Sequence, residues 1–254
     1  PKDRATALAI LRRVVDAGVN HIDTAQFYGP DVANELIHEA LHPYPEQLVL
    51  VSKVGAARSA DGAWMAAQRP AELRAGVQAN LRSLELEQIP IVNLRRHPES
   101  DVPFSEQVDA MSALREEGLI GAVGLSNVTL DEYLSARTRT DVACVQNAYN
   151  VTSRHEQDLV DTCRADGVPF VPFFPLGSAF LADRPVLRAP AVQEVAERLG
   201  ASPAQVALAW LLARAPTVLL IPGTSSLPHL EENLAAGEVV LDDTALAALD
   251  DLSG

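Results

Sequence analysis

The stretch EEGLIGAVGLS, residues 116–126, decides the fold of this 254-residue chain. It joins the end of a helical pattern, a glycine and an apolar run, and the same order recurs in DAGVNHID (16–23) and ADGVPFVPFF (165–174). Glycine directly after a helix is a common helix stop. Apolar strands that each follow a helix are typical of parallel strands covered by helices. The three joints therefore predict an α/β fold.

Outward from these joints, helical and strand-like patterns alternate along the whole chain. Strands are expected at residues 21–24, 48–54, 89–94, 122–126, 144–149, 169–174 and 217–222. Helices are expected at residues 5–17, 31–41, 71–84, 104–117, 130–137, 156–165, 191–199, 203–214, 228–236 and 244–252. A (β/α)8 TIM barrel is the leading prediction, and a doubly wound open sheet is the alternative. The dinucleotide-binding glycine motif that such an open sheet carries follows none of the strands.

The predicted strands number seven, whereas a closed barrel of this class has eight. Since the chain opens on a helical pattern, we expect the first strand to precede Pro1. No linker or low-complexity segment interrupts the sequence. We therefore predict a single domain over residues 1–254.

The composition limits the function. The formal net charge is -14, from 34 acidic and 20 basic residues, which argues against nucleic acid or an anionic membrane as a partner. Cys144 and Cys163 form neither a disulfide framework nor a metal-ligand spacing, so no metal is expected. With no apolar run of membrane-spanning length, a cytoplasmic setting is the expectation. The oligomeric state is left open.

Polar residues stand where the predicted strands end, which is where chemistry sits in a barrel of this kind. Lys53 ends an apolar strand and is one of only two lysines, the other being Lys2, so its identity suggests a role that arginine does not fill. Asp23 ends the preceding strand, and Tyr28 follows it in a turn-rich stretch. An ammonium beside a phenol stabilises the phenolate and makes the phenol a better general acid. The alternative is an ordinary ion pair with a surface tyrosine.

Six motifs, in this order and spacing, carry a family resemblance. They are HIDTAQFYG (21–29), LVSKVG (50–55), VGLSN (123–127), VQNAYN (145–150), PFFPLGS (172–178) and IPGTSSLPHLEEN (221–233). Together they resemble the aldo-keto reductase family. That family consists of (β/α)8 barrels that use NADPH or NADH to reduce aldehydes and ketones. The resemblance therefore implies a small-molecule carbonyl substrate, NADPH as cofactor and NADH as the other possibility.

The resemblance also assigns roles to individual residues. Asp23, Tyr28 and Lys53 match the catalytic residues: hydride reaches the carbonyl carbon from nicotinamide C4, and Tyr28, tuned by Lys53 and Asp23, donates the proton. The implied cofactor-binding residues are Ser126, Asn127 and Gln146 at the carboxamide, Phe173 under the nicotinamide, Leu176, Gly177 and Ser178 near the pyrophosphate, and Thr224, Ser225, His229, Glu232 and Asn233 around the adenosine.

Two positions depart from the family pattern. The fourth catalytic residue is usually a histidine, and alignment without gaps puts Arg95 there; His97, two residues further along, is the alternative. A guanidinium still donates to a carbonyl oxygen. At the site of the 2′-phosphate, where many members carry Lys and Arg, this chain has Gly223 and His229.

Two rival functions remain open at the level of the sequence. The first is a nicotinamide-cofactor-binding protein without catalysis, such as a redox sensor or regulatory protein, and Arg95 is the residue that keeps it open. The second is an unrelated barrel enzyme that uses Asp23 and Lys53 for Schiff-base or proton-transfer chemistry. Turnover of a simple aldehyde separates the reductase from both rivals.

Overall fold

The computed structural model describes residues 3–59, 61–177 and 186–252. Its contacts gather into two compact units, Pro1–Gln146 and Asn147–Gly254, called here the first and second units. The prediction of a single domain is not tested by this division and stays a prediction. None of the described helices is long and apolar enough to cross a membrane.

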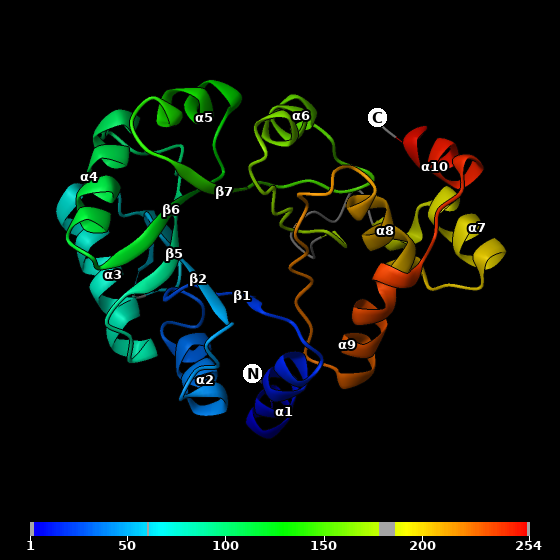
Figure 1. Cartoon of the computed structure of the whole chain (residues 1–254), viewed down its shortest axis with the longest axis horizontal. Coiled ribbons are helices and arrows are strands. Elements are labelled where there is room, and N and C mark those ends of the chain that lie inside the picture. The colour runs from blue at the N-terminus through cyan, green and yellow to red at the C-terminus, as the bar shows by residue number, and fades with distance from the viewer. Residues whose placement is uncertain (1–2, 60, 178–185, 253–254) are drawn as a thin grey trace. The chain divides into compact units, whose positions relative to one another are not determined.

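The first unit alternates helices with a parallel sheet (Figure 1). Its helices are α1 (Arg4–Asp16), α2 (Val32–Leu41), α3 (Pro70–Leu84), α4 (Phe104–Glu116) and α5 (Leu130–Arg137). Its sheet strands are β1 (His21–Asp23), β2 (Val49–Val54), β5 (Ile89–Arg95), β6 (Ile120–Ser126) and β7 (Val142–Gln146). The strands pair in the order β1-β2-β5-β6-β7, all parallel, and α2 to α5 lie along one side of the sheet.

The helix ends in this unit follow from local sequence. Gly118, after α4, adopts a positive φ of 78°, as expected of the glycine stop in residues 116–126. Helix α5 begins with a capping box, in which the Thr129 hydroxyl accepts from the backbone of Glu132 and the Glu132 carboxylate accepts from the backbone of Thr129. The predicted span of α5 is therefore confirmed to the residue.

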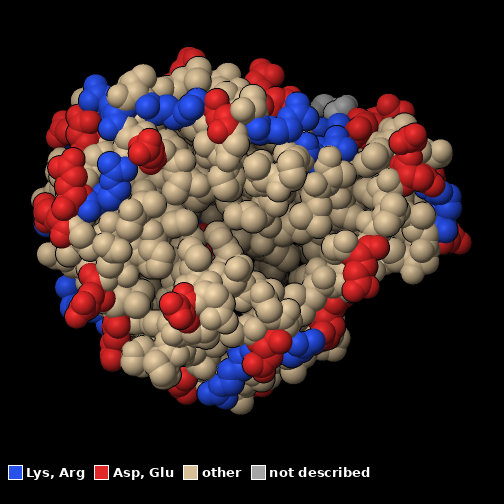
Figure 2. All heavy atoms as spheres, in the orientation of Figure 1, with Lys and Arg blue, Asp and Glu red and all other residues tan. Residues whose placement is uncertain are grey.

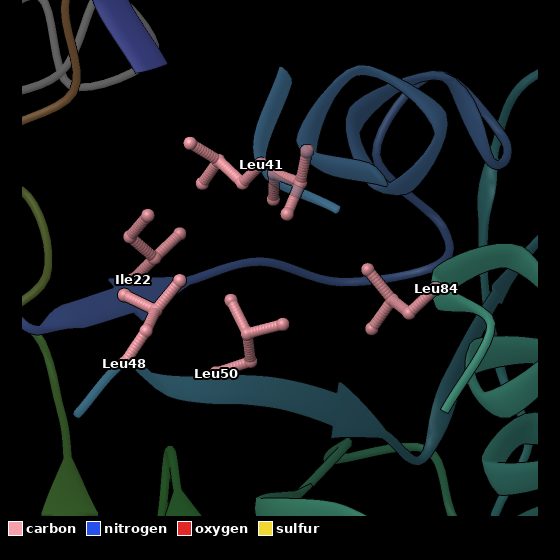
Figure 3. Close-up of a cluster of buried hydrophobic side chains, with 6 residues drawn as sticks. Ile22, Leu41, Leu48, Leu50 and Leu84 are labelled. Atoms are coloured by element: carbon pink, nitrogen blue, oxygen red, sulfur yellow. The ribbon is translucent and has the colours of Figure 1, made fainter. Parts of the chain in front are cut away.

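A cluster of buried aliphatic side chains joins β1, β2 and the helices beside them (Figure 3). It consists of Ile22, Ile37, Leu41, Leu48, Leu50 and Leu84. Burial of such side chains contributes about 1.5–3 kcal/mol each. The cluster fixes β1 against β2 in the register that pairs Asp23 with Val51, two residues before Lys53.

The sheet is strongly curled. Its two edge strands are β1 and β7, yet the Gln146 side chain of β7 donates from Nε2 to Asp23 Oδ2 of β1 over 2.9 Å. A flat five-stranded sheet separates its edges by about 19 Å, at about 4.8 Å per strand. This hydrogen bond therefore requires the curvature of a barrel wall.

The second unit contains α6 (Gln157–Asp166), α7 (Pro190–Leu199), α8 (Pro203–Leu212), α9 (Leu227–Leu234) and α10 (Asp243–Asp250), with short 3-10 turns η1 (Val186–Arg188) and η2 (Ala235–Glu238). Trp210 of α8 is fully buried and stacks on Tyr149, with ring centroids 5.7 Å apart. Asp250 accepts from Trp210 Nε1 over 2.8 Å and from Arg214 over 3.0 Å. These contacts tie α10 to α8.

Two predicted strands are wrong as continuous strands. In place of strands at 169–174 and 217–222, the second unit has isolated parallel bridges, Phe170 with Val218 and Ala148 with Phe173. Pro169 and Pro172 lack the N–H that a continuous ladder needs, which explains the interruption. The strand expected at 144–149 is also shifted, because β7 ends at Gln146.

A short hairpin follows β2 and was not predicted. Strands β3 (Ala56–Arg58) and β4 (Trp64–Ala66) pair antiparallel. The Arg58 guanidinium lies 3.5 Å from the centre of the Trp64 ring. In the view of Figure 2, acidic and basic side chains are mixed with one another mainly around the outline.

Candidate active site

Lys53 and Asp23 form a buried ion pair at the ends of neighbouring strands. Only 2% of the Lys53 side chain is exposed. Its Nζ contacts Asp23 Oδ1 and donates to the Thr24 carbonyl over 3.0 Å. The other Asp23 oxygen accepts from Gln146 Nε2. Both carboxylate oxygens are thus engaged, which offsets the cost of burying the charge.

The pKa of Lys53 is raised above its ordinary value. Burial by itself lowers the pKa of the ammonium, but the charges of Asp23 and Tyr28 and the hydrogen bonds to both outweigh burial. Lys53 therefore keeps its charge at neutral pH, inside a site that would otherwise favour the neutral amine.

Tyr28 lies over this ion pair. The Lys53 Nζ is 5.0 Å from the centre of the Tyr28 ring. The Tyr28 side chain is 40% exposed, whereas Phe27 beside it is buried and meets the Tyr28 ring edge-on, with centroids 5.5 Å apart. A buried aromatic neighbour fixes the ring while the phenol stays open to a reactant. The structure thus brings together Asp23, Lys53 and Tyr28.

Arg95 ends β5 on the same face of the sheet. Its strand register pairs Arg95 with Ser126, and its Nη1 lies 3.4 Å from Ser126 Oγ. Burial lowers the pKa of the Arg95 guanidinium, and the nearby Tyr28 acts in the opposite direction. Arg95 therefore shares its surroundings with the phenol, as the alignment without gaps predicts.

His97 lies in the turn that follows β5. Its Nδ1 accepts from the backbone N–H of Glu99 over 3.3 Å, and its carbonyl accepts from Ser100 and from Arg96. The ring is thereby held by its own turn. Of the two candidates for the fourth position, Arg95 is the one at the end of the strand.

The three predicted carboxamide ligands also lie at strand ends. Ser126 and Gln146 are buried and pair in register between β6 and β7. Asn127 is exposed, adopts a positive φ of 59°, and donates from Nδ2 to the Arg96 carbonyl over 3.1 Å. The bonds made by the Gln146 and Asn127 amide nitrogens orient both amides, so their oxygens are suitable acceptors for a carboxamide N–H.

Gln68 is a residue that the sequence analysis missed. It is buried between β4 and α3, its Nε2 donates to the Arg95 carbonyl, and its Oε1 accepts from Arg96 Nη1 over 3.1 Å. It therefore fixes the backbone that carries Arg95. A lone glutamine before a helix gives no sequence signal for such a contact.

In the second unit, Phe173 is half-buried and its backbone is anchored. Its N–H donates to the Asn147 carbonyl over 2.9 Å, and its ring meets Phe174 edge-on. Leu176 and Gly177 follow, with Gly177 at a positive φ of 85°. Ser178 lies outside the described residues.

The remaining predicted residues lie just before α9 and along it. The Ser226 hydroxyl caps this helix by accepting from the His229 N–H, and the Thr224 hydroxyl accepts from the Ser226 N–H over 3.1 Å. Ser225 and His229 are exposed, while Glu232 and Asn233 on α9 are half-buried. Hydroxyls at a helix N-terminus are suited to bind an anion.

One further group has the composition of a metal site. His38 and His42 of the α2 end and Glu85 of the α3 end place ligand atoms within 4.8 Å of one another. His42 and Glu85 are exposed, and His38 Nε2 lies 3.3 Å from Glu85 Oε2, which is the contact of an ordinary surface pair. The absence of a metal site stays a prediction.

Comparison with known proteins identifies the family. The model of the aldo/keto reductase family matches residues 1–253. The chain belongs to the aldo/keto reductase family. It is 43% identical over 258 residues to pyridoxine 4-dehydrogenase of Escherichia coli (strain K12), a match that covers 100% of this chain and 88% of the relative.

Solved structures of aldo/keto reductases agree. An aldo/keto reductase from Klebsiella pneumoniae in complex with NADP and acetate is 30% identical with a TM-score of 0.84, covering 98% of this chain and 85% of that one. An aldo-keto reductase of the same organism in complex with NADPH is 31% identical, also with a TM-score of 0.84 and coverages of 98% and 85%.

Membership of the aldo/keto reductase family confirms two predictions from the sequence. The (β/α)8 barrel class is confirmed by these likenesses together with the curled parallel sheet. The chain is an oxidoreductase, as predicted. The roles of individual residues rest on the geometry described above and stay predictions.

Proposed function

We propose that this chain catalyses the NADPH-dependent reduction of an aldehyde or ketone, with Tyr28 as the proton donor. The single observation that carries the proposal is the buried Lys53–Asp23 pair beneath an exposed phenol, with Nζ 5.0 Å from the ring centre. A buried ammonium next to a tyrosine stabilises the phenolate that remains after the proton has left. An ion pair with only a structural role does not need a phenol above it.

Each unit, taken by itself, offers donors that suit one part of a nicotinamide cofactor. Ser126, Asn127 and Gln146 offer a hydroxyl and two oriented amides for a carboxamide, and Phe173 offers a half-exposed ring for stacking. The hydroxyls of Thr224 and Ser226 at the start of α9 suit a phosphate. NADPH, when bound, supplies a hydride to the carbonyl carbon. The complexes of the Klebsiella pneumoniae relatives with NADP and NADPH support NADPH over NADH.

The chain's own residues supply the proton and the charge. Tyr28 donates its phenolic proton to the carbonyl oxygen as the oxygen becomes negative, and Lys53, held by Asp23, stabilises the phenolate. Arg95 donates an N–H to the same oxygen. Solvent returns a proton to Tyr28, which is exposed.

The first substrate pair to test comes from a relative. Pyridoxine 4-dehydrogenase of Escherichia coli is 43% identical to this chain. We therefore propose pyridoxine and the aldehyde formed by oxidation at its position 4 as candidate substrates.

A reducing, cytoplasmic setting agrees with the two free cysteines, Cys144 and Cys163, which are both buried.

Loss of aldehyde-dependent NADPH oxidation in Tyr28→Phe tests the function. We expect the rate to fall about 10²–10⁴-fold, the usual contribution of a general acid. Cofactor binding, followed by fluorescence titration, stays unchanged because the phenol hydroxyl is not among the proposed cofactor ligands. Binding of NADPH without turnover of any aldehyde by the unmodified chain would instead support the redox-sensor alternative. Trapping of a carbonyl compound on Lys53 by borohydride would support the Schiff-base alternative.

A further inference from the structure

The C-terminal ends of α2 and α3 bring two histidines and a glutamate together. His38 lies in the last turn of α2, His42 is the C-cap residue of this helix, and Glu85 is the C-cap residue of α3. One ligand atom from each of the three side chains lies within 4.8 Å of the others. Imidazole nitrogens together with a carboxylate oxygen are a ligand set that Zn²⁺ takes in proteins.

The spacing of His38 and Glu85 fits two ligands of one ion. His38 Nε2 is buried and forms no hydrogen bond within the described part of the chain, although it lies 3.3 Å from Glu85 Oε2. As an ion pair, this is an ordinary surface contact. A tetrahedral zinc ion with bonds of about 2.0–2.1 Å, however, holds its ligand atoms about 3.3 Å apart. The two atoms therefore already have the separation of two zinc ligands.

His42 lies on the same side of α2 as His38, because residues four apart are neighbours on a helix surface. The planes of the two rings meet at 31°, with the centroids 4.7 Å apart. The backbone N–H of His42 donates to the His38 carbonyl over 2.9 Å, and Tyr44 meets the His42 ring edge-on. Since the His42 side chain is exposed, its rotation toward a bound ion does not disturb the core.

The two helix ends that carry these ligands are fixed to each other. Leu41 and Leu84, which precede His42 and Glu85, both belong to the buried aliphatic cluster (Figure 3). The Tyr44 hydroxyl donates to the Leu84 carbonyl over 2.8 Å. Ligands that are held in place before the ion arrives lose little conformational entropy when they bind it.

The local charge favours a cation. A helix carries about half a negative charge at its C-terminal end, from carbonyl groups that lack a partner within the helix. Glu85 adds a carboxylate at this end of α3, where basic side chains are preferred. Arg82, in the last turn of α3, offsets only part of this charge. An ion bound between the two helix ends neutralises the negative charge that gathers there.

We propose that His38, His42 and Glu85 form a zinc site that clamps the end of α2 to the end of α3, with water as the fourth ligand. Each helix ends before the next sheet strand begins, so the site lies where β2 and β5 start, whereas Lys53 lies near the end of β2. This side of such a barrel serves stability and not chemistry. The expectation of no metal, which rested on the cysteines, is the alternative.

Isothermal titration calorimetry of the whole chain with zinc chloride, after a chelator has been added and removed, measures the binding. We expect a single site in the unmodified chain. Glu85→Gln and His42→Ala should each weaken the Kd at least about tenfold, because even the loss of an outer contact to a metal ligand costs about 10- to 100-fold. Glu85→Gln preserves the size of the side chain and decides the matter if His42→Ala fails to fold.

Thermal unfolding followed by circular dichroism tests the clamp. Zinc at about 100 times its Kd should raise the Tm of the unmodified chain by about 5–10 °C. Ca²⁺ and Mg²⁺ should not produce this shift, because they prefer oxygen ligands. His155→Ala is the matched control: His155 is exposed and lies outside the site, so its loss should leave the Kd and the Tm shift unchanged.

Each part of the inference fails on a different result. A lack of zinc binding by the unmodified chain overturns the site and supports the absence of a metal. Binding that stays undiminished in the folded variants, or that His155→Ala weakens equally, overturns the assignment to these three residues. Binding without a rise in Tm overturns the clamp. None of these results bears on the reductase function, which Tyr28→Phe tests separately.

Discussion

Two sets of buried polar residues lie on opposite sides of the same sheet in the first unit. On one side, Asp23, Lys53 and Arg95 are charged and lie next to the exposed Tyr28. On the other, Thr24 and Ser52 face the helices and bond to Asn34 and Asn80.

The second set is neutral and internally satisfied. Thr24 Oγ1 donates to Asn34 Oδ1 over 2.9 Å, and Asn34 Nδ2 donates to Asn80 Oδ1, also over 2.9 Å. Asn80 Nδ2 in turn donates to the Gly76 carbonyl, so the network closes on the backbone of α3. Burial of polar groups at strand ends is therefore no sign of chemistry by itself. Charge, together with access from solvent, separates the two sides.

The largest effect is expected from Lys53→Met. Aldehyde reduction should fall about 10²–10⁴-fold because the phenolate loses its cation. The free energy of unfolding should also drop by about 3–5 kcal/mol, since Asp23 is left buried without its partner. Kinetics with NADPH and urea unfolding measure the two effects. A folded Lys53→Met variant with normal turnover would contradict the role given to the charged side.

An effect on stability alone is expected from Asn80→Ala on the opposite side. Removal of this amide leaves Asn34 and Ser52 short of a partner, and the free energy of unfolding should fall by about 1–3 kcal/mol. The kcat should stay unchanged at a temperature where the variant is folded. A loss of kcat comparable to that of Lys53→Met would show that the two sides are not distinct. Leu73→Ala in the same helix, α3, provides an apolar control for destabilisation.

The smallest effect is expected from Tyr44→Phe, on the pH dependence of the free energy of unfolding. Burial, with a contribution from Glu85, raises the pKa of Tyr44 to about 12 from the ordinary 10.0, and its hydroxyl donates to the Leu84 carbonyl over 2.8 Å. The pKa of Tyr44 is higher in the folded chain than in the unfolded chain. The neutral phenol therefore stabilises the fold fully below about pH 10, and this stabilisation is lost as pH rises through about 12. Tyr44→Phe should therefore flatten the fall in stability between these pH values. An identical alkaline profile in the variant would refute this cause.

The sequence predicts the helices and the inner strands well because their signals are local. Glycine stops, capping residues and apolar runs place α5 and β5 nearly to the residue. It also predicts the grouping of Asp23, Tyr28 and Lys53, since the ends of adjacent parallel strands meet at one edge. The direction of a side chain alternates along a strand, which separates Lys53 from Ser52 once the strand is placed.

The rest depends on contacts that no local pattern contains. The β3–β4 hairpin follows β2 directly. The motif around Lys53 does not indicate that β3 begins there or that it pairs with β4. The sequence also leaves open where β5 ends, which depends on the backbone hydrogen bonds of Arg96 and Ser100. Arg95 as the fourth catalytic residue stays a prediction. The apolar run at residues 169–174 favours a strand, whereas Pro169 and Pro172 within it break the ladder, and the sequence alone does not show which of the two effects prevails.

The hydrogen bond from Gln146 to Asp23 has a consequence for the order in which the chain folds. It joins residues 123 positions apart, so it belongs to the most non-local contacts of the first unit. Contacts of such separation form late, because the loop-closure entropy must be overcome first. During synthesis, Asp23 Oδ2 gains this hydrogen bond only after β7 has been made. The arrangement that holds the Asp23 carboxylate is therefore completed late in the folding of the chain.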